Sequence, residues 1–162
     1  MNSTTQYPPA GVWRRVAAMF YDSFLLFAVL FIATALAGLI VNQGASLPSV
    51  AEGETVNDIP QQVSGWGFQL YLFLVTALFY SIFWRKNGQT LGMQAWRIQL
   101  QQSDGSTPSW HHCFKRVLAA VVALLPAGLG LWWAWIDADQ RSWHDRLSDT
   151  RVVLLPKQSR SA

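Results

Sequence analysis

Asp22 is the first residue whose type and position call for a chemical explanation. It is the only charged residue between positions 16 and 41, a stretch that is otherwise mostly apolar. Arg15 precedes it by seven residues, so an α-helix would place both on nearly the same face, about 10 Å apart along the axis. A carboxylate in such a segment is costly unless it is paired, hydrated or protonated. Asp22 is therefore either a proton or cation site or half of a structural pair with an arginine.

A second group of ionisable residues lies near the end of the chain. Its members are Asp137, Asp139, Arg141, His144, Asp145, Arg146 and Asp149. Arg141, Asp145 and Asp149 are spaced four apart and would line one face of a helix. His144 is the member whose side chain ordinarily titrates near neutral pH. The group is either a proton or cation site or a solvated helix at a membrane interface whose charges pair among themselves.

No pattern in the sequence predicts catalysis or a bound metal. His111, His112 and Cys113 are adjacent, and adjacent side chains on a helix point about 100° apart, so they cannot converge on one ion. The chain also lacks a nucleophile with a histidine and an acid at a suitable spacing. We expect a protein that is not an enzyme and that carries no metal and no cofactor.

The composition predicts an integral membrane protein. Apolar residues make up 51% of the 162 residues and charged residues 13%, about half of the usual charged share of a soluble domain. This apolar content excludes disorder, and the single cysteine excludes a disulfide scaffold. The net charge of +3 is too small and too dispersed to indicate a nucleic-acid partner. The expected partner is the lipid bilayer.

Three apolar segments could enter that bilayer, since a spanning helix needs about 20 mostly apolar residues. Residues 66–84 and 117–136 contain no Asp, Glu, Lys or Arg. Trp66 and Trp84 bracket the second segment, as expected for aromatic residues at the two interfaces. We predict an all-α membrane protein with one domain over residues 1–162: helix 16–41, outer loop 42–65, helix 66–84, cytoplasmic loop 85–116, broken helix 117–136 and tail 137–162.

The distribution of Lys and Arg predicts the orientation, because cytoplasmic loops are enriched in both. Arg14 and Arg15 precede the first helix, and the loop 85–116 holds five basic residues. The loop 42–65 holds none and carries three acidic residues. The N-terminus and the loop 85–116 are therefore expected in the cytoplasm.

The third apolar segment has two interpretations. Pro126, Gly128 and Gly130 interrupt its middle, and proline and glycine break or loosen helices. The segment is either a kinked full span or a re-entrant hairpin with both ends in the cytoplasm. Five basic residues in the tail favour the hairpin. Residues 96–101 and 150–155 have strand-like patterns and could pair as a small cytoplasmic β-ribbon, but only if the tail is inside.

Three sequence motifs in this order resemble the RDD family of small bacterial membrane proteins. They are WRRVAAMFYD at 13–22, NGQTLGMQAWRI at 87–98 and DADQRSWHDRLSDTRVV at 137–153. The resemblance implies that Arg15 is the family arginine and Asp22 its first aspartate. Asp145 matches the second aspartate, with Asp137 as the alternative. The resemblance also implies a multi-pass protein of the bacterial inner membrane.

The activity of this family is largely undefined, although a transport role has been suggested and some members are linked to sodium/proton exchange. Two functions remain open for this chain. In the first, Asp22 exchanges a cation for a proton, with Asp145 and His144 as a cytoplasmic relay. Two or three membrane spans are too few to enclose a path for ions. This function therefore requires a homo-oligomer or a membrane partner protein. In the second, the chain is a scaffold or accessory subunit in which Arg15, Asp22, Arg141 and Asp145 form a structural ion-pair network.

Overall fold

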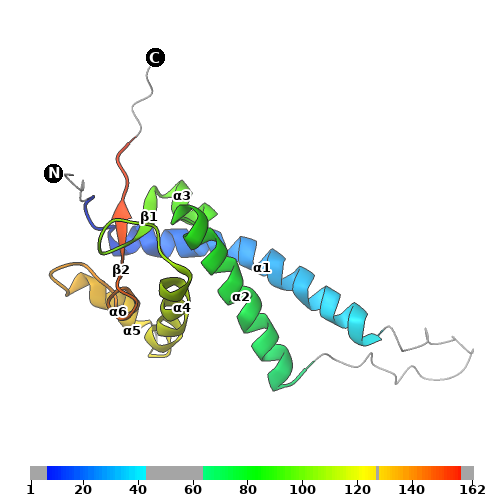
Figure 1. The fold of residues 1–162 in the computed structure, drawn as a ribbon. Helices are drawn as coiled ribbons and strands as arrows, with labels where there is room; N and C mark the ends of the chain where they lie inside the picture. Colours follow the sequence, from blue (N-terminus) through cyan, green and yellow to red (C-terminus); the bar gives the residue numbers. More distant parts are fainter. Residues whose placement is uncertain (1–6, 43–63, 127, 158–162) are drawn as a thin grey trace, which may run out of the picture.

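Two long helices dominate the structure. The computed structural model describes residues 7–42, 64–126 and 128–157. Helix α1 covers Val12–Asn42 and helix α2 covers Trp66–Asn87. Both are long and apolar enough to cross a membrane, which agrees with the first two predicted spans. Their outer halves project together from the rest of the chain (Figure 1).

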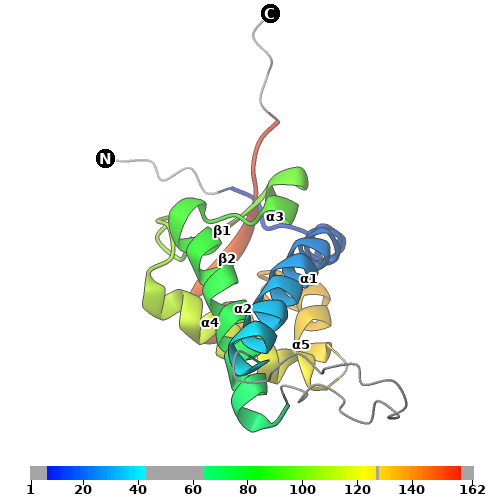
Figure 2. The same cartoon turned by 90° about the vertical axis from the view of Figure 1, so that its right-hand side faces the viewer.

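The remaining elements form a base around the first turns of α1. They are α3 (Leu91–Ala95), β1 (Ile98–Gln102), α4 (Trp110–Leu124), α5 (Leu129–Trp132), the 3-10 helix η1 (Trp133–Trp135), α6 (Trp143–Leu147) and β2 (Thr150–Leu154). Figure 2 views this base from the end at which α1 and α2 project. α1 begins in the base and α2 ends there, so the two helices run in opposite directions.

The β-ribbon joins the two segments that the sequence marks as strand-like. β1 and β2 pair antiparallel, with Leu100 opposite Val152. Pro9 forms a bridge to Val153, and the Ala10 N–H donates to the carbonyl of Val152 at 2.9 Å. These bonds hold the start of the described chain against its final strand. The tail therefore lies on the same side of the molecule as the residues that precede α1.

The third apolar segment folds back on itself. α4 ends at Leu124, and Gly128 adopts a left-handed conformation with φ 77° before α5 begins. A Cβ atom on Gly130 would lie 2.5 Å from the Cβ of Ala123, so α5 packs directly against α4. Leu131 and Ala134 then pack against Val12 at the start of α1. Both ends of this segment thus lie in the base.

The sequence expectation of a helix that carries Arg141, Asp145 and Asp149 on one face is wrong. α6 covers only Trp143–Leu147. Arg141 precedes it, and Asp149 follows it with φ 50°, which ends the helix. The three side chains therefore share no helix face.

Candidate functional site

Asp145 is the centre of a buried ion triad. Its side chain is fully buried and lies between two arginines from distant parts of the chain. Arg15 Nη1 donates to Oδ2 at 2.5 Å, and Arg116 Nη1 donates to Oδ1 at 2.6 Å. The Ser142 N–H also donates to Oδ2, at 3.0 Å, as part of the capping box that begins α6. Each carboxylate oxygen therefore has an arginine partner.

The two arginines connect the triad to most of the base. Arg15 Nε donates to the carbonyl of Ala10, and its Nη2 donates to the carbonyl of Gln140, both at 2.9 Å. Arg116 Nη1 donates to Thr150 Oγ1 at 2.7 Å. The guanidinium of Arg116 also stands 5.5 Å from the centre of the Trp84 ring. The triad thus links α1, α2, α4, α6 and β2, an arrangement that favours a structural role.

The electrostatics of the triad keep Asp145 charged and His144 neutral. Burial alone would raise the pKa of Asp145, but Arg116 and Arg15 outweigh it and hold that pKa well below its usual value. Burial and the charge of Arg116 lower the pKa of His144 from 6.5 to about 3. The expectation that His144 titrates near neutral pH is therefore wrong, because the side chain is desolvated beside two cations.

Acidification is expected to destabilise the protein through His144. An unfolded histidine takes up a proton near pH 6.5, whereas folded His144 stays neutral down to about pH 3. The unfolded state binds more protons between these values, so stability falls as the pH falls through that window. In detergent, the melting temperature of His144→Gln should decline less than that of the wild type between about pH 7 and pH 4. Equal declines would contradict a neutral buried His144.

Asp22 accepts hydrogen bonds from uncharged donors. Its side chain is buried, at 3% exposure. Thr90 Oγ1 donates to Oδ2 at 2.5 Å, and the Gly92 N–H donates to Oδ1 at 2.8 Å. No ion-pair partner of Asp22 occurs in the described part of the chain. The interpretation that Asp22 pairs with an arginine is therefore wrong, because Arg15 pairs with Asp145.

Asp22 also lines a cavity of about 280 Å³ between α1, α2 and α4. Apolar and aromatic side chains make up most of its wall, including Phe73 and Val121. Tyr80 and Thr90 add hydroxyl groups to it, and Arg15, Arg116 and His144 also line it. A buried carboxylate with neutral hydrogen-bond donors on the wall of a cavity is a candidate proton or cation site.

The remaining predicted site residues lie at the edge of the base. Asp137 accepts from the Arg141 N–H at 2.9 Å and pairs with Arg146. The hydrogen bond from Arg141 outweighs the small effect of burial and, with the charge of Arg146, lowers the pKa of Asp137. The side chain of Arg141 has no hydrogen bond or ion pair within the described ranges, although it lines a second pocket. Asp137 and Arg141 are thus separate from both Asp22 and the triad.

Sequence reasoning missed two residues of these sites. Arg116 entered only as one of the basic residues of the loop 85–116, although it completes the triad. Thr90 entered only as part of the motif at 87–98. Thr90 lies in the connection after α2 and also accepts from the Met93 N–H as the N-cap of α3. A threonine followed by a short helix was a signal for a cap, but not for its contact with Asp22.

Among the described residues, no group of three or more His, Cys, Asp or Glu side chains is arranged to hold a metal ion. The two buried acids differ in their partners: Asp145 is paired with two arginines, whereas Asp22 accepts hydrogen bonds from Thr90 Oγ1 and the Gly92 N–H.

Comparison with known proteins assigns the chain to a family. The profile of the RDD family matches residues 9–149, a range that contains α1, α2, the ion triad residues and Asp22. Searches of curated proteins and of solved structures found no match. Because the family profile covers most of the chain, this membrane protein belongs to the RDD family.

Proposed function

We propose that this protein exchanges a cation for a proton across the bacterial inner membrane, with Asp22 as the binding group. The observation that carries the proposal is the contrast between the two buried acids. Asp145 is neutralised by two arginines, whereas the hydrogen-bond partners of Asp22 in the described part of the chain are the neutral donors Thr90 and Gly92, on the wall of a cavity that Arg15 and Arg116 also line. A carboxylate in that state can take up either a proton or a cation.

The basic residues near the base predict the orientation of the proposed transporter in the membrane. It holds the start of α1 and the end of α2, where Arg14, Arg85 and Lys86 lie. The positive-inside rule therefore favours a cytoplasmic base, with a cytoplasmic N-terminus and β-ribbon. The hydrogen bonds between the N-terminal segment and β2 support a tail on that same side. They favour the re-entrant hairpin over a full third crossing for residues 117–136.

Two spanning helices do not enclose a pathway, so the proposal includes a homo-oligomer or a membrane partner. Of the ion-pair network suggested from the sequence, Arg15 and Asp145 form a pair. Asp22 and Arg141 do not join it within the described ranges, and Arg116 takes part instead. Because the side chains of Arg15, Arg116 and Asp145 join α1, α4 and α6, they support a second candidate function, an accessory subunit whose activity belongs to a partner.

Proton flux in proteoliposomes tests the exchange. A sodium or potassium gradient imposed on the wild type should move protons, read by a pH-sensitive dye in the lumen. Asp22→Asn keeps the size of the side chain but cannot carry the charge, so the flux should fall to the rate of empty vesicles. Asp149→Asn, a change of an exposed acid that lines neither pocket, serves as the matched control.

The two candidate functions give different outcomes. Unchanged flux in Asp22→Asn would refute exchange at this residue. Absence of flux in the wild type, together with a lower melting temperature of Asp22→Asn, would instead support the accessory subunit. The amount of reconstituted protein must be equal in all vesicles, since flux scales with it.

A further inference from the structure

A second pocket, of about 320 Å³, lies at the edge of the base and is separate from Asp22. One wall is the segment before α1, around Tyr7 and Pro9. Another is the connection 138–141 between η1 and α6, and the third is β2. In contrast to the apolar cavity between the helices, this pocket presents charged and polar side chains.

Two arginines that line this pocket make no ion pair within the described ranges, although the charge of Arg141 contributes to the lowered pKa of Asp137. Arg141 and Arg151 are both half-buried, and neither side chain makes an ion pair or hydrogen bond within the described ranges. The Nε atom of Arg151 is fully buried and has no hydrogen-bond partner among the described residues. The single acid on the wall, Asp139, is exposed, and the charge of Arg15 is shared with Asp145. These half-buried guanidinium groups have N–H donors without an acceptor, and a bound anion would supply one.

The walls of the pocket are held in place by the ion triad and its neighbours. Gln140 adopts a left-handed conformation with φ 52°, and its carbonyl accepts from Arg15 Nη2 at 2.9 Å. The Arg141 N–H donates to Asp137, which also pairs with Arg146. Arg151 lies on β2, opposite Gln101 in the ribbon. The backbone that carries the two arginines is therefore held in place before any ligand binds, which lowers the entropy lost on binding.

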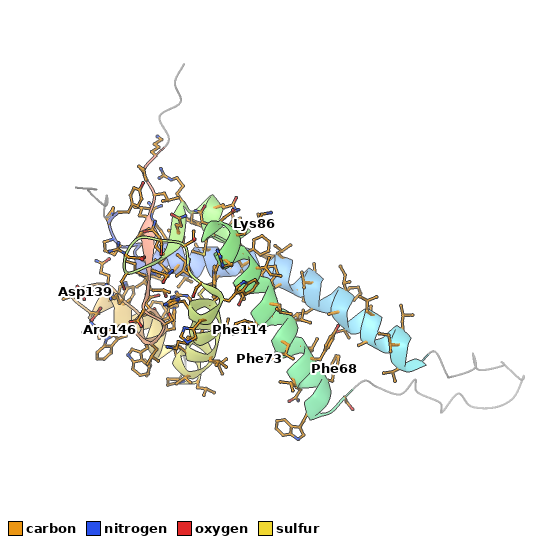
Figure 3. The ribbon with its side chains drawn as sticks, viewed as in Figure 1. Phe68, Phe73, Lys86, Phe114, Asp139 and Arg146 are labelled. Atoms are coloured by element: carbon orange, nitrogen blue, oxygen red, sulfur yellow. The ribbon has the colours of Figure 1, made fainter. Side chains whose placement is uncertain are left out.

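The pocket lies next to a cluster of aromatic and apolar side chains. Trp133, Trp135 and Ile136 are exposed, and Ile136 reaches 78%. Trp13 contacts Trp135 edge to face at the start of α1. Tryptophans gather at the interface between lipid tails and headgroups, and the wall of the pocket begins only two residues after Ile136. Figure 3 shows Asp139 and Arg146 at the outer edge of the base, away from Phe68 and Phe73 on the projecting helix.

We propose that Arg141 and Arg151 bind the phosphate group of an anionic membrane lipid. Two guanidinium groups offer planar, paired donors that match phosphate oxygens. A pocket beside interfacial tryptophans lies at the depth of lipid headgroups, which makes a lipid the source of that phosphate rather than a free ion. The site does not involve Asp22, and the proposal is independent of cation exchange.

Lipid binding to the detergent-purified protein tests this assignment. Native mass spectrometry counts the lipids bound per chain as phosphatidylglycerol, phosphatidylcholine or inorganic phosphate is added. The wild type should bind phosphatidylglycerol more tightly than phosphatidylcholine. Arg141→Gln with Arg151→Gln should weaken phosphatidylglycerol binding at least about tenfold, since two charged hydrogen-bond donors are lost.

A matched pair of substitutions controls for total charge. Arg85→Gln with Lys86→Gln removes the same charge from the exposed end of α2, and Lys86 lies well away from Asp139 (Figure 3). This pair should leave the affinity for phosphatidylglycerol unchanged. Equal affinity in the two double variants, or equal binding of both lipids to the wild type, would overturn the proposal. If the wild type bound inorganic phosphate and showed no preference for phosphatidylglycerol, the ligand would be free phosphate and not a lipid.

Melting temperatures show whether each variant is folded. If the double variant does not fold, Arg141→Gln alone provides the test, because that side chain has no partner within the described ranges. It should still weaken phosphatidylglycerol binding severalfold, and an unchanged affinity would count against the site.

Discussion

Replacement of Asp145 in Asp145→Asn should greatly lower the free energy of unfolding of the base. Asparagine has nearly the same shape as aspartate but cannot neutralise Arg15 and Arg116, which both lie at about 5% exposure. Breaking a buried ion pair by removing one partner costs about 3–5 kcal/mol, because the remaining charge is left uncompensated. Here two cations would be left beside each other. We expect a much lower melting temperature in detergent and little accumulation of the variant in membranes.

Asp149→Asn is the matched control for this experiment. Asp149 is exposed, lies four residues from Asp145 and has a positive φ that asparagine also tolerates. Its melting temperature should stay close to that of the wild type. If both variants melted at the wild-type temperature, the triad would not stabilise the base. A double variant that replaces Arg15 and Asp145 with apolar residues of similar size should recover part of the loss, since it leaves fewer uncompensated charges.

Gly92→Ala should disrupt the contact between α3 and α1. A Cβ atom on residue 92 would lie 2.3 Å from the backbone oxygen of Ala18 and 2.9 Å from the carboxylate of Asp22. A backbone oxygen cannot rotate away as a side chain can, so α3 would have to move. Overpacking of this kind costs about 3 kcal/mol or more at a tight site. The movement would also weaken the hydrogen bond from the Gly92 N–H to Asp22.

We therefore expect a lower melting temperature and impaired proton flux in Gly92→Ala. Gly67→Ala is its control, because a Cβ atom there would meet nothing within 4 Å, and its α-helical position favours alanine over glycine. Wild-type stability of Gly92→Ala would show that α3 does not approach α1 so closely. Lower stability with normal flux would separate the packing of α3 from the chemistry of Asp22.

Much of the local structure was predictable, because it follows from short-range patterns. Two mostly apolar stretches of sufficient length predicted α1 and α2, since the bilayer sets the length of a spanning helix. Alternation and β-branched residues marked both strands of the ribbon. Pro126 and the glycines after it predicted a break in the third apolar segment. The order of the three motifs pointed to the family.

The contacts of the buried charges were decided by the tertiary structure. Helical spacing placed Arg15 and Asp22 on nearly the same face, and the sequence therefore suggested an interaction between the two side chains. The fold instead brings Asp145 to Arg15 across 130 residues of sequence and to Arg116 across 29. Asp22 is satisfied by Thr90 and Gly92, from the connection after α2.

Local structure was predictable and the contacts of buried charges were not, because the two depend on interactions of different range along the chain. The apolar pattern of a segment determines whether it is helical and which medium it prefers, because each residue contributes independently of distant ones. The partner of a buried charge depends on which segments pack together. Here that packing follows from the reversal at Gly128, the ribbon between β1 and β2, and the close approach at Gly92. The sequence by itself therefore determined the membrane helices and the charged residues that needed partners, and only the tertiary structure decided which partners they have.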